Sequence, residues 1–233
     1  MMTPKPPDPV TELRTTSAAL PCRVAPLPRE LVSSYIHRLA DANMLNTEEL
    51  RVTITGDRRQ TAPPRMEVLA RLSGFCENTL RHALPELQPS ALSDWHTRKA
   101  GPGCTLCGVA RGATRPFHIW RRGPEDVLCR RHNRWTTGSN VDMRQDREQP
   151  NLTHQPEILA AHRLHLRLIR KHGRTNITHA FYTAADILDH WRETRSHDHA
   201  ATATIHRRIS IFLGPQWETV TSHSPVAAAA HYP

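Results

Sequence analysis

Hydrophobic residues recur at helical spacing in several stretches of the chain and predict a mainly α protein. The first stretch is "LPRELVSSYIHRLADANML", in which one side of a helix is formed by Leu31, Tyr35, Leu39 and Ala42. Pro28 suits the first turn of a helix, and Glu30 suits the positive end of the helix dipole. We therefore expect the ordered part to begin with an amphipathic helix that buries one face.

The stretch "PPRMEVLARLSGFCENTLRHALPEL" predicts two short helices joined by a turn. Ala70 lets the helices approach, Gly74 makes the turn, and Leu80 plugs the core from the second helix, a spacing typical of a helix-turn-helix. An ordinary helical hairpin is the alternative. The second helix is expected from about Glu77 to Leu84. Four of its side chains are then candidates for contact with a DNA major groove: Asn78, Thr79, Arg81 and His82.

The stretch "QPEILAAHRLHLRLIRKHG" predicts a helix between Pro156 and Gly173. Its apolar face is expected to hold Ile158, Ala161, Leu164 and Leu168. Positive charges recur along one side, at Arg163, Arg167, Arg170, Lys171 and Arg174. No carboxylate interrupts this stripe after Glu157. Such a stripe is either a solvated face or a surface for an anion such as DNA or RNA.

Two more helices are expected towards the C-terminus. The stretch "TNITHAFYTAADILDHWRET" predicts a strongly amphipathic helix, and "ATATIHRRISIFLG" predicts a last one. The first of them is expected to pack its apolar face into a core, with the residues Ile177, Ala180, Phe181, Ala184, Ile187, Leu188 and Trp191.

Two pairs of metal-binding residue types lie between these helical regions. Cys104 and Cys107 are separated by two residues, as are Cys129 and His132. Paired ligands at this spacing form tight knuckles that fill two corners of a zinc tetrahedron each. We expect one structural Zn²⁺ in a small ribbon, with a short hairpin in residues 108–128 and His118 as a hairpin residue rather than a ligand. A redox role for "CTLC" is disfavoured because the strand and helix of a thioredoxin-like setting are absent.

Arginines surround this predicted ribbon and add a basic surface that suits phosphate groups. They are Arg121, Arg122, Arg130, Arg131 and Arg134. Cys22 and Cys76 have no neighbouring partner in the sequence and are not expected as ligands.

Six segments follow from these patterns and from the proline-rich and polar ends. We expect a disordered arm (1–26), a helical region with the helix-turn-helix pair (27–100), a zinc ribbon (101–138), a linker (139–154), a C-terminal helical bundle (155–214) and a disordered tail (215–233).

Composition narrows the classes of partner. The 233 residues carry a formal net charge of +9, and only three of the 31 lysines and arginines are lysines. Arginine offers a planar fork of donors that matches phosphate oxygens, so DNA is the expected partner. No apolar run approaches the roughly 20 residues that cross a bilayer, and the N-terminus does not resemble a signal peptide. We expect a cytoplasmic protein with no membrane and no small-molecule substrate.

The order of these motifs resembles the TniQ family over about residues 26–137. The residues that carry the resemblance to its opening helix are Pro28, Glu30, Arg38, Leu39, Ala40 and Asn43. The stretches "LARLSGF" and "ALPEL" are similar to its next helical pair, and two cysteines, a tryptophan and "VLCRRHNRW" are similar to its zinc ribbon. The resemblance implies a non-enzymatic accessory of DNA transposition, a target-site adaptor that links DNA or an RNA-guided complex to an ATPase that recruits the transposase.

This chain is short, has one ribbon and has no obvious large C-terminal target-recognition domain. Three other functions therefore remain under consideration. One is a stand-alone transcriptional regulator, and another is a scaffold whose C-terminal helices bind protein. The third is a His-Asn-His-type nuclease, suggested by "CRRHNRW" but lacking the spaced residues for a second metal.

Overall fold

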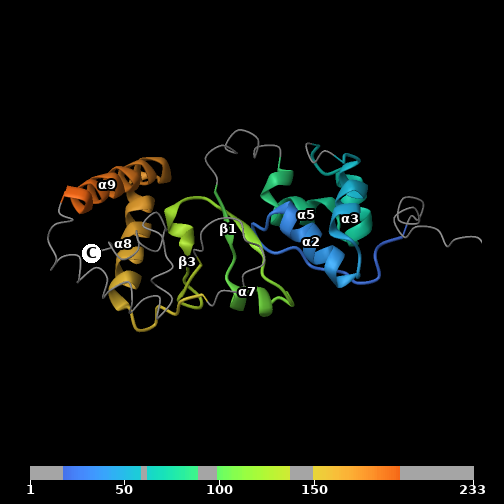
Figure 1. Cartoon of the computed structure of the whole chain (residues 1–233), viewed down its shortest axis with the longest axis horizontal. Helices are drawn as coiled ribbons and strands as arrows, with labels where there is room; N and C mark the ends of the chain where they lie inside the picture. Colours follow the sequence, from blue (N-terminus) through green and yellow to red (C-terminus); the bar gives the residue numbers. More distant parts are fainter. Residues whose placement is uncertain (1–17, 59–61, 89–98, 137–148, 195–233) are drawn as a thin grey trace, which may run out of the picture. The chain divides into compact units, whose positions relative to one another are not determined.

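The computed structural model describes residues 18–58, 62–88, 99–136 and 149–194 (Figure 1). The chain divides into two compact units, each considered by itself. The first unit comprises Met1–Ala100 and Gly108–Trp120, and the second comprises Gly101–Cys107 and Arg121–Pro233. The expected tail and last helix lie outside the described residues, as does most of the expected arm and linker.

The first unit is built from short helices, as the hydrophobic spacing predicts. They are α2 (Val32–Ala42), α3 (Thr47–Thr55), α4 (Met66–Ser73), α5 (Glu77–Ala83) and the 3₁₀ helix η1 (Pro85–Leu87). The Asn46 side chain caps α3 by accepting from the backbone N–H groups of Glu48 and Glu49. Gly74 ends α4 in the left-handed conformation, with φ of 70°, so the predicted turn between the paired helices is confirmed.

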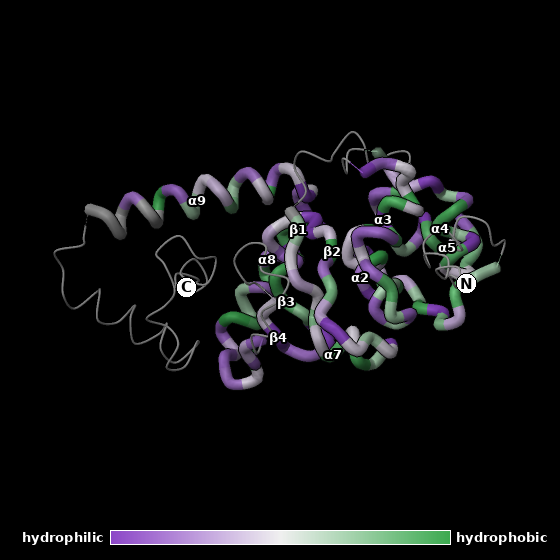
Figure 2. The backbone as a smooth tube through the Cα atoms, turned by 45° about the vertical axis from the view of Figure 1, so that its right-hand side comes forward, coloured by the Kyte–Doolittle hydropathy of each residue, from purple (hydrophilic) through white to green (hydrophobic). Residues whose placement is uncertain are grey.

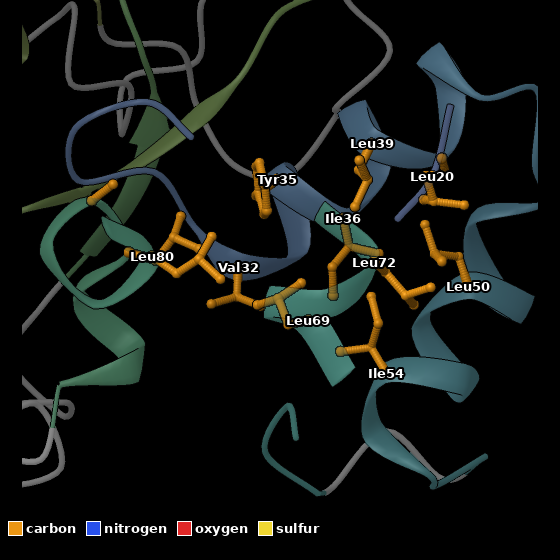
Figure 3. Close-up of a cluster of buried hydrophobic side chains, with 13 residues drawn as sticks. Leu20, Val32, Tyr35, Ile36, Leu39, Leu50, Ile54, Leu69, Leu72 and Leu80 are labelled. Atoms are coloured by element: carbon orange, nitrogen blue, oxygen red, sulfur yellow. The ribbon is translucent and has the colours of Figure 1, made fainter. Parts of the chain in front are cut away.

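One apolar core holds these helices together (Figure 3). Tyr35, Leu39 and Leu72 are completely enclosed, and the core continues into α3 and α5. Its buried members are Leu20, Val32, Tyr35, Ile36, Leu39, Ala40, Leu50, Ile54, Leu69, Leu72, Leu80, Ala83 and Leu84. The apolar face predicted for the first helix is therefore the one that the protein buries, although Ala42 at its end is exposed.

Glu30 differs from the expectation of a charge at a helix end, because it is fully buried beside α2. Its carboxylate accepts two hydrogen bonds of 2.7 Å from the guanidinium of Arg38, one from each of Nε and Nη2. The Ser34 hydroxyl and the Leu27 backbone N–H also donate to it, at 3.1 and 3.0 Å. This buried carboxylate is therefore satisfied by an ion pair and by neutral donors.

Residues 18–26 also differ from the expected disordered arm, because they pack on α2 and α4. The Leu20 backbone N–H donates to the Leu72 carbonyl at 2.9 Å. The Tyr35 hydroxyl donates to the Val24 carbonyl, and Arg38 Nη2 donates to the Ala25 carbonyl, both at 2.9 Å. The helical unit therefore includes this segment.

The second unit combines short strands with two long helices. Its elements, and those shared with the first unit, are β1 (Lys99–Pro102), α7 (Thr105–Val109), β2 (His118–Arg121), the 3₁₀ helix η3 (Pro124–Val127), β3 (Leu128–Cys129), β4 (Arg134–Trp135), α8 (Pro156–His172) and α9 (Arg174–Thr194). β3 and β4 pair antiparallel, with Leu128 opposite Trp135 and Cys129 opposite Arg134. β2 is a strand as predicted, but it pairs with β1, so the hairpin expected within residues 108–128 is wrong.

The C-terminal helices are joined to these strands through a segment that the sequence assigned to a linker. Leu152 is fully buried with Leu128 and Trp135, and its N–H donates to the Asn133 carbonyl at 2.7 Å. The Trp135 N–H donates to the Pro150 carbonyl at 3.0 Å. Residues 149–154 therefore belong to the strand-bearing part of this unit.

The buried side of α8 is rotated from the expected one. Its buried residues are His162 and His165, whereas Leu164 and Leu168 are 50% and 37% exposed. The His162 ring can be buried because its Nε2 donates to the Glu125 carbonyl at 2.9 Å. Hydrophobicity alone therefore selected the wrong face of this helix.

α9 follows α8 in a different direction, and hydrophobic and hydrophilic residues alternate along it (Figures 1 and 2). The expected core packing of its apolar face is not met at Ala180, Ala184 and Ile187, which are exposed. Phe181 does turn inwards and meets the His165 ring edge-on, with centroids 5.5 Å apart. Within the described residues, no helix has both the length and the apolar character that a membrane span requires.

Candidate metal centre

Four side chains converge within the second unit. Cys104 precedes α7 and Cys107 lies within it, while Cys129 ends β3 and His132 lies in the turn to β4. Asn133 adopts a left-handed conformation, with φ of 47°, and so lets the chain reverse directly after His132. The β3–β4 pairing therefore shapes the second knuckle, and the first knuckle lies against it in space although the two are far apart in the sequence.

The ligand atoms of these four residues all lie within 4.8 Å of one another. His132 Nδ1 is 3.4 Å from Cys104 Sγ, 3.3 Å from Cys107 Sγ and 3.6 Å from Cys129 Sγ. Cys107 Sγ is 3.6 Å from Cys129 Sγ. The group can therefore hold a metal ion with one atom from each residue. His118 lies in β2 of the first unit and is not part of this group.

Burial and neighbouring thiols disfavour the charged forms of Cys104 and Cys107 in the absence of a cation. Burial, followed by the neighbouring thiols Cys129 and Cys104, raises the pKa of Cys107 to about 12. Burial also raises the pKa of Cys104. A bound cation reverses this preference because a coordinating thiol loses its proton. The site is therefore arranged so that a metal ion and three thiolates stabilise one another.

Gln149, the first described residue after segment 137–148, supports the first knuckle. Its Nε2 donates to the Gly103 carbonyl at 2.7 Å, and its Oε1 accepts from the Thr105 backbone N–H at 3.0 Å. Arg134 Nη1 donates to the Gln149 carbonyl at 2.7 Å and so links this support to β4. These contacts fix the backbone on both sides of Cys104.

Arg121 is not the surface cation that the sequence predicted. It is half-buried, and its Nη2 donates to the Thr136 carbonyl at 2.7 Å. Burial lowers the pKa of its guanidinium. The Arg121 guanidinium also lies so close to Gly101 that a side chain at position 101 would clash with it. Arg121 therefore ties the strands of the second unit together.

Of the other arginines predicted around the ribbon, Arg134 is partly buried, whereas Arg122, Arg130 and Arg131 are exposed. Arg122 donates to the Asp126 carboxylate through its backbone N–H at 2.8 Å and through Nε at 3.3 Å. Arg130 and Arg131 lie between the two ligands of the second knuckle and make no ion pair among the described residues. Their positive charges therefore face solvent beside the cluster.

The basic stripe predicted along one helix is divided by the structure. Arg163, Arg167, Arg170 and Lys171 are exposed on α8, as expected. Gly173 ends α8, so Arg174 begins α9 and pairs with the buried carboxylate of Glu125. The prediction of Arg174 as an exposed member of the stripe is therefore wrong.

The candidate DNA-contacting residues of α5 are all exposed, in the first unit, and are Asn78, Thr79, Arg81 and His82. Arg81 Nη2 lies 3.0 Å from the Glu77 carboxylate, one helical turn before it. The Thr79 hydroxyl lies 3.1 Å from Cys76 Sγ at the start of the helix. Part of the polar capacity of this surface is therefore used within α5 itself.

Several residues that stabilise the two units could not be identified from the sequence pattern. Gln149 and His162 contact segments 46 and 37 residues away, so local spacing does not reveal them. The i, i+8 spacing of Glu30 and Arg38 was available but is easily met by chance. The four metal ligands were found because each pair lies within one knuckle.

Comparison with known proteins adds one finding to this geometry. The TniQ family model matches residues 21–134, a range that includes all four ligands. Searches of curated proteins and of solved structures returned no match. Gln149, α8 and α9 lie beyond the matched range, so elements that support the ligand cluster come from outside it.

Proposed function

Because residues 21–134 belong to the TniQ family, we propose that this protein is a non-catalytic, zinc-stabilised accessory of DNA transposition that binds DNA. In this role it acts as an adaptor between a DNA target and the rest of a transposition machinery. A transposition ATPase is the protein partner that we propose for it. The observation that carries the proposal is the closed ligand group within the matched region.

Zn²⁺ is the metal that suits this group best. Three sulfurs and one imidazole are a common structural zinc set, and bonds of about 2.3 Å to sulfur and about 2.0 Å to nitrogen imply tetrahedral edges of roughly 3.5–3.8 Å. Four of the six separations between the ligand atoms are 3.3–3.6 Å and all six lie within 4.8 Å, which supports this assignment. When bound, zinc joins the two knuckles and stabilises the fold of the module.

The ligand count supports a structural role rather than a catalytic one. A catalytic zinc keeps one position for water or substrate, whereas four protein ligands complete a tetrahedron. His132 is one of these ligands, so it does not serve as the base of a His-Asn-His-type nuclease. Exposed arginines around the module support contact with DNA phosphates.

The test is a combined measurement on the purified full chain. We expect one zinc per chain, binding to a 30-base-pair duplex that weakens steeply with salt, and no cleavage of plasmid DNA in Mg²⁺ or Mn²⁺. Metal-dependent cleavage that is lost when His154 or another histidine outside the cluster is changed to Ala would contradict the proposal. Association with an ATPase encoded beside the gene would support the transposition role.

A protein-binding scaffold is the second candidate. It is favoured by the large apolar side chains that α8 and α9 leave exposed, namely Leu164, Leu168, Tyr182 and Ile187. Surface patches of this kind mark protein interaction sites. A stable protein complex together with no affinity for any duplex would favour the scaffold over the DNA-binding protein.

A further inference from the structure

Six exposed cations of the second unit lie on two neighbouring elements. Four of them lie on α8 and two lie in the turn that carries His132. We call this set the α8 surface, and its members are Arg130, Arg131, Arg163, Arg167, Arg170 and Lys171.

The four cations on α8 form one side of that helix. His162 and His165 mark its buried side. At 3.6 residues per turn, positions 167 and 171 lie opposite to this side and positions 163 and 170 lie on the adjoining flank. The row from Arg163 to Lys171 spans roughly 12 Å at about 1.5 Å per residue. No ion pair of these four side chains is seen in the part of the chain that the structure describes.

The two cations in the His132 turn lie close to the first half of α8. Leu128, one residue before Cys129, belongs to the buried cluster against which Ile158 and Leu159 of α8 pack. The His162 ring is hydrogen-bonded to Glu125 just before this strand. The charge of Arg130 also contributes, after burial, to the lowered pKa of His162. The zinc module and α8 therefore present their cations from adjoining parts of one unit.

The nearby acidic groups do not neutralise this surface. Glu125 is buried and paired with Arg174, and Asp126 accepts from Arg122. Glu157 is the acidic residue in the first turn of α8, more than one turn before Arg163. Like charges on successive turns of α8 repel one another and destabilise the helix, so binding of a polyanion would reduce this repulsion.

We propose that the α8 surface, rather than helix α5, binds the phosphate backbone of duplex DNA. This inference rests on the proposed DNA binding and assigns it to a surface whose four α8 cations lie outside the family match, while Arg130 and Arg131 lie within it. Five of the six cations are arginines, whose forked donors suit phosphate oxygens. On α5, by contrast, Arg81 is paired with Glu77 and only His82 adds a second basic group.

The test compares three variants of the full zinc-loaded chain on the same 30-base-pair duplex across a salt series. The first is Arg163→Gln/Arg167→Gln/Arg170→Gln/Lys171→Gln, and the second is Arg130→Gln/Arg131→Gln. The third, Arg81→Gln/His82→Gln on α5, is the matched surface control. Each lost phosphate contact lowers the slope of log K against log salt by about 0.9.

We expect the slope to fall by about 3–4 in the first variant and by about 1–2 in the second, with binding about 100-fold weaker in the first at 0.1 M salt. The α5 variant is expected to change affinity less than about threefold. Zinc content and melting temperature are measured for each variant. If the fourfold variant does not fold, Arg163→Gln and Arg167→Gln are tested singly, and each should lower the slope by about 1.

Two results would overturn the inference, and they differ in what else they affect. If the intact chain binds duplex but the α8 and turn variants keep its slope, the surface is assigned wrongly while the proposed function stands. Loss of binding in the α5 variant alone has the same meaning. If the intact chain binds an acidic polypeptide but no duplex, the inference and the proposed DNA binding both fail.

Discussion

The two units of this chain differ in the interactions that stabilise their folds. The first buries thirteen residues in one apolar core and adds a fully enclosed ion pair. In the second, the buried apolar cluster among the described residues is Leu128, Trp135 and Leu152. Apolar burial dominates folding free energy, so the second unit needs another source of stability. The four-ligand cluster supplies that source in our account.

The largest expected effect is removal of the metal. Cys129→Ser, or a strong chelator, should unfold the second unit and leave the first folded, because structural zinc contributes about 10–16 kcal/mol in small zinc domains. Amide hydrogen exchange should show lost protection in α8 and retained protection in α2 and α4. Cys76→Ser, which changes an exposed thiol outside the cluster, is the control. Unchanged protection in α8 after metal removal would show that the second unit does not depend on the metal for its stability.

The next effect concerns the buried ion pair of the first unit. Arg38→Met leaves the Glu30 carboxylate buried without its partner, which should cost about 3–5 kcal/mol of unfolding free energy. Urea denaturation of the first unit measures the loss. Glu48→Gln breaks the Arg51–Glu48 surface pair on α3 and should cost less than about 1 kcal/mol. Equal losses in the two variants would show that enclosure of the pair is unimportant.

A smaller effect is expected at the turn between α4 and α5. Gly74→Ala forces a side chain into the left-handed conformation, at about 1–2 kcal/mol. Its new Cβ would also lie 3.0 Å from Arg23 Nε. Gly112→Ala is the matched control, since Gly112 has a similar φ of 78° and no atom within 4 Å of a new Cβ. Thermal melting should show a larger loss for Gly74→Ala; equal losses would exclude any contribution of the Arg23 contact.

The smallest expected effect is a pH dependence confined to the second unit. Burial, then the charge of Arg130, lowers the pKa of His162, and burial lowers that of His165. Unfolded histidine binds its proton near pH 6.5, so the unfolded state binds more protons between that pH and the lowered folded pKa. Stability is therefore complete above about pH 6.5 and is lost progressively below it.

Urea unfolding of the second unit between pH 7.5 and 5.5 checks this dependence, with zinc followed by a colorimetric indicator so that acid release of the metal is recognised. His165→Phe should flatten part of the slope while zinc stays bound. A second unit that keeps the same stability across this range with zinc bound would contradict the burial of neutral histidines.

The difference between the units also explains which features the sequence could predict. Helical spacing located α2, α4 and α5 because their cores are made of regularly spaced apolar residues. Two knuckles at fixed spacing located Cys104, Cys107, Cys129 and His132 for a similar reason. In each case the residues that reveal the feature lie within a few positions of one another in the sequence.

The sequence failed where distant contacts override the local pattern. The inner face of α8 was misjudged because His162 is buried through a hydrogen bond to Glu125, 37 residues away. Arg174 is not part of the predicted stripe, because Gly173 ends α8 before it and because its guanidinium pairs with the buried Glu125 carboxylate. Arg121 was misassigned because its role depends on Thr136, which follows β4 and lies 15 residues away.

The central claim is that one tetrahedral zinc with no vacant position organises the second unit. X-ray absorption spectroscopy at the zinc edge of the purified full chain tests it most directly. We predict one zinc per chain with three sulfur ligands at about 2.3 Å and one nitrogen at about 2.0 Å. A coordinated water oxygen, or a fully folded second unit that carries no metal, would contradict the account.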